Sequence, residues 1–300
     1  HMVYHILFNP FAGNGRCTQD CKKVEPFLKG GECRFTDMTK ISDYGAFLAG
    51  VSDADALVLC GGDGTLNRFI NDTAELTLPK RILYFATGSG NDFLHDIGGT
   101  PLQEPTDITK YLKDLPIVTV KGKDYRVLNG VGYGIDGYCC EVGDKLRATS
   151  KKPVNYTSIA IKGLLFHYKP TNATVIADGK EYRFDKVWLV PTMNGRFYGG
   201  GMMPTPAQDR LNPAHTISAM VYRAANKFQA LMVFPSIFKG EHIKKEKLVK
   251  ILSGDEITVR FDRPTALQID GETILGVSEY TMRAAAPAAK RDAAAQSSAS

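Results

Sequence analysis

The segment ALVLCGGDGTLN occupies residues 56–67 and decides how the N-terminal part of the chain folds. Its first five residues, Ala56–Cys60, form an apolar run with the length of a buried strand. The glycines that follow predict a tight turn, and we expect the stretch Leu66–Leu76 to be helical. A buried strand, a glycine-bearing turn and a helix are therefore predicted in direct succession.

Two further strands are predicted with the same kind of ending. Tyr4–Asn9 and Arg81–Phe85 are short apolar runs, and each leads into a turn that contains glycine. Strands that alternate with helices indicate an α/β domain, a parallel sheet with helices on both faces. Ligands bind such sheets at the carboxyl ends of the strands, so the three glycine loops are expected at one edge.

From about Pro116 the pattern changes to short strand-like segments with tight turns. Asp178-Gly179 separates two of them and is a hairpin signal. This pattern indicates an antiparallel β-sandwich-like or barrel-like second domain. Helices are expected near 155–168 and 225–238. We expect domains at residues 1–115 and 116–283, followed by a disordered Ala- and Ser-rich tail at 284–300. The predicted strands of the second domain are 117–120, 125–128, 173–176, 181–184, 187–190, 216–222, 247–252 and 256–261.

Composition limits the classes of protein that need to be considered. The chain has 300 residues, 43% hydrophobic and 23% charged, which is ordinary for a globular protein. No apolar run reaches the roughly 18 to 20 residues of a membrane span, and a cytoplasmic location is expected. The six cysteines show no CxxC spacing, so reduced thiols are expected. The net charge of +5 includes basic runs at 145–152 and 239–250, which are either solvated faces or surfaces attracted to an anionic membrane.

The turn at Gly61–Thr65 has the chemistry of a phosphate site. Glycines let backbone amides approach a phosphate closely, and the N-terminus of the following helix favours negative charge. Asp63 would repel a bare phosphate, so it is expected either to act through Mg²⁺ or to hold the loop together. The alternative is a tight strand-to-helix turn without a ligand. Similar turns at 9–15 and 87–93 favour one shared nucleotide pocket, and no GxxxxGK[ST] motif is present.

Four motifs in order resemble the diacylglycerol kinase catalytic family, and in particular the bacterial lipid kinases that are similar to sphingosine kinases. They are Asn9–Gly13, Gly61–Asn67, Gly88–Phe93 and Gln268–Glu272, with a weaker fifth match at Leu128–Asp136. The GGDGT motif is shared with NAD kinases and phosphofructokinases. The stretch after Gly88 and the late Asp-Gly-Glu resemble the lipid-kinase form.

This resemblance implies a lipid kinase that uses ATP and Mg²⁺, with an active site in the cleft between two domains. Glu272 would be the general base, Asp270 would support it, and Asp63 would organise Mg²⁺ and its water. Taken alone, Asp270-Gly271-Glu272 would indicate an exposed hairpin turn. The residues expected to bind ATP are Asn9, Pro10, Phe11, Ala12, Gly13, Thr36, Gly61, Gly62, Asp63, Gly64, Thr65, Leu66, Asn67, Thr87, Gly88, Asn91 and Asp92.

The family also implies a structural Mg²⁺ site in the second domain. By match, Asp209 would ligate with its side chain, and Pro206 and Leu211 with their carbonyl groups. Arg210 stands where a glycine is common, which speaks against the site. The apolar residues of 155–168 predict either a helix packed on the sandwich or a lip of the lipid pocket, near Lys151, Lys152 and Lys162.

The sequence leaves two other functions open. An NAD kinase-like or small-polyol kinase would share GGDGT, and a non-catalytic nucleotide or lipid sensor could keep the fold. The expected partners are ATP, a lipid substrate and, transiently, a membrane surface, with the protein peripheral to the inner face of the membrane. Nucleic acid is not among them, and a homodimer is possible through sheet edges.

Overall fold

The computed structural model describes residues 1–88, 90–149, 159 and 162–285. The chain divides into two compact units, His1–Lys113 and Asp114–Ser300. The predicted basic residues Lys151 and Lys152, and the predicted tail from residue 286 onward, lie outside the described residues. All six cysteines are unpaired.

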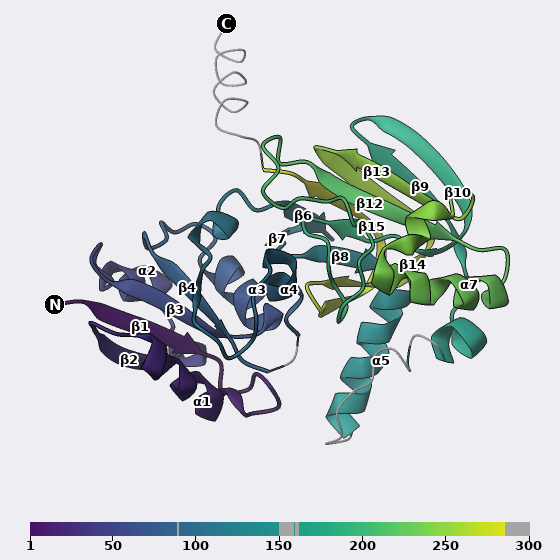
Figure 1. Cartoon of the computed structure of the whole chain (residues 1–300). Coiled ribbons are helices and arrows are strands. Elements are labelled where there is room, and N and C mark those ends of the chain that lie inside the picture. Colours follow the sequence, from purple (N-terminus) through teal and green to yellow (C-terminus); the bar gives the residue numbers. More distant parts are fainter. Residues whose placement is uncertain (89, 150–158, 160–161, 286–300) are drawn as a thin grey trace, which may run out of the picture. The chain divides into compact units, whose positions relative to one another are not determined.

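Within the described residues, the first unit contains a sheet of five strands in the order β2-β1-β3-β4-β5 (Figure 1). The first four strands run parallel, as predicted, and β5 is antiparallel to β4. β2 was missed because its side chains are only partly buried and give no continuous apolar run. The bounds are β1 Val3–Phe8, β2 Glu32–Asp37, β3 Ala56–Gly61, β4 Ile82–Ala86 and β5 Thr106–Asp107.

Short helices connect these strands. The predicted helix after the central glycine loop is α3, and it begins and ends earlier than expected, at Asp63–Asp72. It ends where the Thr73 hydroxyl donates to the Phe69 carbonyl. The remaining helices are α1 Cys17–Asp20, α2 Tyr44–Ala49 and α4 Asp92–Ile97, with 3-10 turns η1 Cys21–Phe27, η2 Met38–Lys40 and η3 Thr109–Leu112.

The second unit is an antiparallel sheet that closes on itself, which confirms the predicted sandwich or barrel class. The closing strand is β14, which pairs with β15 and β8 and also with β9. The hairpin predicted at Asp178-Gly179 joins β9 to β10, with positive φ at both residues. The strands are β6 Ile117–Val120, β7 Lys123–Arg126, β8 Gly130–Tyr133, β9 Thr171–Ala177, β10 Lys180–Leu189, β11 Thr192–Met193, β12 Ile217–Arg223, β13 Val249–Gly254, β14 Glu256–Ile269 and β15 Glu272–Arg283.

β14 is one long strand where a single short one was predicted. Its register against β15 shifts between Arg260 and Thr265 and again before Leu267. Pro264 lies in this irregular stretch, where a missing N–H group costs no ladder hydrogen bond. The first part of β14 can therefore pair with β9 and the last part with β8, which closes the sheet.

Helical segments cover parts of this sheet. The longest is α5 Ile135–Thr149, which was not predicted (Figure 1). The helix expected near 225–238 is present as α7 Lys227–Val233 and η5 Phe234–Lys239, followed by η6 Glu241–Lys244. Of the stretch 155–168, residues 155–158, 160 and 161 lie outside the described residues, and the described part includes η4 Gly163–His167. Among the described residues, no helix combines the length and apolar composition that crossing a membrane requires.

Candidate functional site

The three glycine loops of the first unit meet, two of them through backbone hydrogen bonds and the third by close approach. The Asp63 N–H donates to the Gly90 carbonyl at 2.8 Å, and the Thr87 N–H donates to the Gly61 carbonyl at 3.0 Å. A Cβ on Gly88 would lie 3.6 Å from the Cα of Gly13. The structure therefore brings together the loops that follow β1, β3 and β4.

Asp63 joins two of these loops with its side chain. One carboxylate oxygen accepts from the Asp92 N–H at 2.7 Å and the other from the Phe93 N–H at 3.0 Å. These are the first N–H groups of α4, which carry partial positive charge and need acceptors. Asp63 is only 8% exposed, so holding the loop, one of its two predicted roles, is a role that the geometry shows.

Glycine is required at different positions of this site for different physical reasons. Gly61 has φ +151°, and a Cβ there would overlap the side chain of Thr65, which is 2% exposed. Thr65 and Leu66 thus pack inside the unit and do not present their side chains to solvent. At Gly64 a Cβ would meet nothing within 4 Å. The open position lies in the first turn of α3, at the positively polarised end of the helix.

The first loop has the features of an exposed turn. The side-chain oxygen of Asn9 accepts from the Phe11 N–H at 3.0 Å, and the Phe11 side chain is 77% exposed. Thr36 pairs with Leu7 across β2 and β1, near the carboxyl ends of both strands. The predicted ATP-binding residues therefore lie along one edge of the sheet.

The residues present fit a nucleotide with a metal on its phosphates. Cβ positions at Gly13, Gly64 and Gly90 point into open space, as a cradle for an anion requires. The Oδ1 atom of Asn91 is buried and has no hydrogen-bond partner among the described residues. A buried amide oxygen without a partner suits Mg²⁺, which prefers oxygen ligands.

In the second unit, Asp270 and Gly271 form the turn between β14 and β15, with φ +48° and +92°. This hairpin turn is not free, because Asp270 is tied to the segment before β8. Its carboxylate accepts from the N–H groups of Leu128 at 2.7 Å, Asn129 at 2.8 Å and Gly130 at 3.1 Å. Glu272 begins β15 and is exposed. Asp270 therefore fixes the backbone from which Glu272 projects.

Arg210 holds the same segment from another direction. Its guanidinium donates to the Leu128 carbonyl at 3.2 Å and to the side-chain oxygen of Asn129 at 2.9 Å. Asn129 is only 2% exposed, so these bonds satisfy groups that water does not reach. The fifth motif of the sequence thus connects Arg210 to the Asp270 turn.

At Asp209, where a Mg²⁺ site is predicted, the side chain bonds to the local backbone. Asp209 is exposed, and one of its carboxylate oxygens accepts from the Leu211 N–H at 2.9 Å. Across the described ranges, no cluster of three or more His, Cys, Asp or Glu side chains has the geometry of a metal site. The other ligands predicted beside Asp209 are backbone carbonyl groups, so the Asp209 metal site stays a prediction.

Asp136 is a buried carboxyl at the start of α5 that belongs to no predicted role. Its Oδ1 atom accepts from the Gly137 N–H at 3.0 Å, and Tyr198 and Gln268 are polar neighbours. Burial raises the pKa of Asp136 to about 7, and these neighbours oppose the shift. A Cβ at Gly132 would overlap the Asp136 carboxyl, which explains a glycine in β8 at this point.

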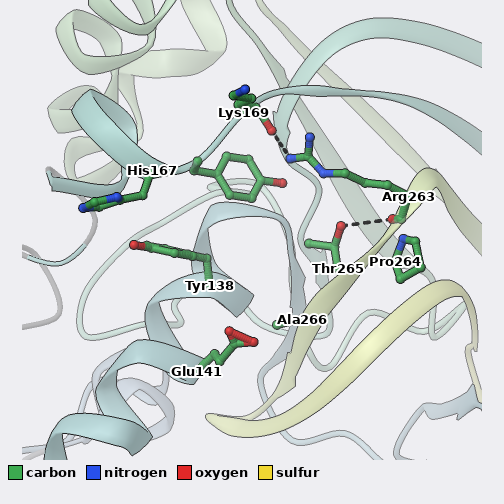
Figure 2. Close-up of a pocket in the computed structure, with 9 residues that line it drawn as sticks. Tyr138, Glu141, His167, Lys169, Arg263, Pro264, Thr265 and Ala266 are labelled. Carbon is green, nitrogen blue, oxygen red and sulfur yellow. Dashed lines mark hydrogen bonds between the residues drawn. The ribbon is translucent and has the colours of Figure 1, made fainter.

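A cavity of about 320 Å³ lies between α5, the residues after η4 and the irregular part of β14. Figure 2 shows Tyr138 and Glu141 on the α5 side and Arg263 on the β14 side. The Arg263 guanidinium donates to the Lys169 carbonyl and lies over the Tyr168 ring, 5.3 Å from its centroid. The cavity is lined by Tyr138, Glu141, His167, Tyr168, Lys169, Arg263, Pro264, Thr265 and Ala266.

None of the polar residues of this cavity was among the predicted site residues. His167 and Tyr168 fall in the stretch considered as a lip of the lipid pocket, whereas Ile159 and Tyr168 also belong to the apolar core. The core packing of Ile159 and Tyr168 agrees with the first alternative, and the lip of a lipid pocket stays a prediction. The available signal for the rest was weak, because Arg263-Pro264 interrupts a strand pattern without resembling any motif.

An α/β unit followed by an antiparallel β unit is the fold that solved diacylglycerol kinase structures share with this chain. The diacylglycerol kinase catalytic domain matches residues 3–120, and the YegS C-terminal NAD kinase beta sandwich-like domain matches residues 129–289. The chain belongs to this diacylglycerol kinase and lipid kinase family.

Individual relatives are similar to this chain over most of its length, at modest sequence identity. A diacylglycerol kinase from Bacillus subtilis (strain 168) is 23% identical over 278 residues, which cover 89% of this chain and 88% of the relative. One from Mycobacterium tuberculosis (strain H37Rv) is 24% identical, with 81% and 80% covered. A crystal structure of a diacylglycerol kinase from Bacillus anthracis has a TM-score of 0.59 at 17% identity, with 94% of both chains covered. Another structure from that organism has a TM-score of 0.66 at 19% identity, with 93% and 91% covered.

Proposed function

We propose that this protein is a MgATP-dependent kinase that phosphorylates a hydroxyl group of a diacylglycerol-like lipid. The observation that carries the proposal is the exposed carboxylate of Glu272 on a turn that Asp270 anchors with three backbone hydrogen bonds. A sensor that only binds a ligand has no need for an immobilised base. Family membership and the interlocked glycine loops support the kinase assignment.

The roles of the residues follow from their surroundings. The loops at 9–13, 61–67 and 87–92 bind ATP, with the positively polarised N-terminus of α3 toward the phosphates. Mg²⁺ supplies charge neutralisation on the phosphates. Asp63 keeps the loops after β3 and β4 in register, and Asn91 and Asp92 would offer oxygen atoms to Mg²⁺.

Glu272 accepts the proton of the lipid hydroxyl as that oxygen forms its bond to the γ-phosphorus. The bond from the γ-phosphorus to the bridging oxygen breaks, and ADP leaves. Asp270 does not touch the reacting atoms and acts as a positioning residue for Glu272. Because the acceptor is a membrane lipid, the protein meets it as a peripheral protein at a membrane surface.

A second kinase class shares the GGDGT motif. An NAD kinase-like enzyme would use the same first unit, and the domain matched in the second unit is described as NAD kinase beta sandwich-like. We favour the lipid acceptor because the curated relatives are named as diacylglycerol kinases.

The test is a transfer assay with γ-labelled ATP against diacylglycerol in detergent micelles, NAD and soluble diols in parallel. We expect label in the lipid alone and dependence on Mg²⁺. Glu272→Gln should lose turnover by at least about a hundredfold, with ATP affinity within about twofold of the wild type. Glu256→Gln, an exposed glutamate on β14, is the matched control and should keep full activity. Transfer of label to NAD, with none to lipid, would contradict the proposed function.

A further inference from the structure

Large apolar side chains are exposed on two neighbouring helical segments of the second unit. Phe166 of η4 is 73% exposed, and Phe228 and Met232 of α7 are 64% and 77% exposed. These are three of the four large apolar side chains above 60% exposure among the described residues. The segments η4 and α7 pack against each other (Figure 1). The three side chains thus gather on one part of the unit.

The arrangement on α7 has a helical period. Phe228 and Met232 are four residues apart, so they lie on one face, and Pro235 continues that face and is exposed. The opposite side of α7 is already buried, since Ala230 and Val233 belong to the apolar core. A helix of a globular protein usually needs one apolar face, and α7 has a second one that the fold of its own unit does not use.

The two segments that carry these side chains have charges of one sign. The segments 162–169 and 227–239 contain four lysines and neither aspartate nor glutamate. All four lysines are exposed, and the Lys227 ammonium lies over the Phe228 ring, 5.4 Å from its centroid. Lysines beside exposed aromatic and aliphatic residues are typical of segments that lie in the interface of a membrane. The four lysines are Lys162, Lys169, Lys227 and Lys239.

We propose that this docking surface, formed by residues 162–169 and 227–239, binds the face of an anionic phospholipid bilayer. Phe166, Phe228 and Met232 enter the boundary between headgroups and acyl chains, and the lysines remain at the headgroups. Each lysine near an anionic surface contributes about 1 kcal/mol. The apolar side chains add the free energy of removing their surface from water.

A second copy of the chain fits this surface poorly. A two-fold interface places the same patch on both partners, so four lysines would face four lysines without a carboxylate among them. Cores of protein interfaces are also depleted in lysine. An anionic bilayer offers the complementary charge together with an apolar layer of the required depth.

The docking surface rests on the peripheral membrane contact of the proposed function and gives it a location, and it serves binding and not transfer. It connects to the second unit's cavity through the chain itself. His167 and Lys169 follow Phe166 directly and line the cavity that Arg263 closes on the β14 side. Docking through Phe166 therefore brings this cavity next to the headgroups.

The experiment is vesicle sedimentation of the full chain without nucleotide, using phosphatidylcholine vesicles with and without phosphatidylglycerol. We expect binding to the anionic vesicles that weakens with salt. Phe228→Ser/Met232→Ser should weaken it by about tenfold or more. Lys162→Gln/Lys227→Gln should weaken it and reduce the salt dependence. The control Leu76→Ser/Ile251→Ser changes two partly exposed apolar residues outside the docking surface and should bind like the wild type.

Equal binding to both kinds of vesicle, or wild-type binding by both surface variants, would overturn the proposal. So would a wild-type dimer in light scattering that Phe228→Ser/Met232→Ser converts to a monomer, because the surface would then join two copies. Thermal unfolding of each variant checks that the fold is intact. Transfer to a short-chain diacylglycerol without vesicles reports on the proposed function alone, so the two proposals can fail separately.

Discussion

The carboxylate of Asp63 accepts a hydrogen bond from the backbone N–H of Asp92 at 2.7 Å, across 29 residues of sequence. This bond joins the loop after β3 to the first turn of α4. An acidic residue inside a phosphate loop is thereby explained by helix capping, since the partial positive charge of α4 meets the carboxylate. The same contact determines how close the two loops lie to each other.

Replacing Asp63 by alanine should cost stability as well as activity. Two hydrogen bonds from buried N–H groups to a charged acceptor disappear, so we expect a loss of about 2 kcal/mol or more in the free energy of unfolding. Denaturant unfolding and calorimetric titration with ATP measure the two effects. Raising Mg²⁺ should restore neither one. An unchanged stability with activity recovered at high Mg²⁺ would show that Asp63 acts only through the metal.

Replacement by alanine should change the stability of the protein in opposite directions at two glycines of the central loop. Gly61→Ala has to displace the Thr65 side chain and should destabilise the protein by about 1 to 3 kcal/mol. Gly64→Ala meets open space inside a helix and should leave stability unchanged or raise it by up to about 1 kcal/mol. Its methyl group would nevertheless occupy the space of a phosphate, so ATP affinity should fall by about tenfold or more. Unaltered ATP affinity in Gly64→Ala would remove this turn from the nucleotide site.

Asp270 and Glu272 should separate a positioning effect from a chemical one. Asp270→Ala leaves three N–H groups without their acceptor, and we expect about 2 kcal/mol or more of lost stability together with lost turnover. Glu272→Gln should lose turnover with the unfolding midpoint unchanged, since its side chain is exposed. Chemical denaturation alongside initial rates distinguishes the two, and a matching loss of stability in both variants contradicts the division of roles.

Arg210 should act as a structural residue. Truncation to alanine leaves the Leu128 carbonyl and the buried Asn129 side chain without a charged donor, and we expect a loss of about 1 to 3 kcal/mol. Mg²⁺ without nucleotide should not shift the unfolding temperature of the wild type or of Asp209→Asn. A Mg²⁺-dependent rise in the wild type that Asp209→Asn abolishes would establish the metal site predicted there.

Asp136 should make stability depend on pH near neutrality. Its folded-state pKa of about 7 lies above the ordinary value of 3.8, so the native state holds a proton that the unfolded state has lost. This contribution to the free energy of unfolding is full below pH 4 and decreases by about 1.4 kcal/mol per unit until pH 7.

The buried His242 opposes this trend, because burial lowers its pKa and acid then favours the unfolded state. The difference between wild type and Asp136→Asn isolates the carboxyl. Urea unfolding between pH 5 and 8 gives that difference, and the wild type should lose stability relative to Asp136→Asn as the pH rises. A constant difference across this range would mean that Asp136 is ionised in the native state.

The sequence by itself determined the class of each unit and its strands that are buried on both faces. β1, β3 and β4 are continuous apolar runs, the pattern of strands that are buried on both faces of a parallel sheet. The glycine after each run indicates a turn that a side chain would obstruct. The partly exposed β2 and the helix α5 carry no such pattern, because their side chains face both solvent and protein.

The tertiary structure decided the partners of the acidic residues. Three aspartates have the same side chain and different surroundings. Asp63 caps α4, Asp136 is buried beside Gly132, and Asp270 anchors a hairpin turn. These contacts join residues up to 142 positions apart, as between Leu128 and Asp270, and local propensity contains no information about such distances. Exposure of Phe228 and Met232 is decided in the same way, because only the packed fold shows which side of α7 is already covered.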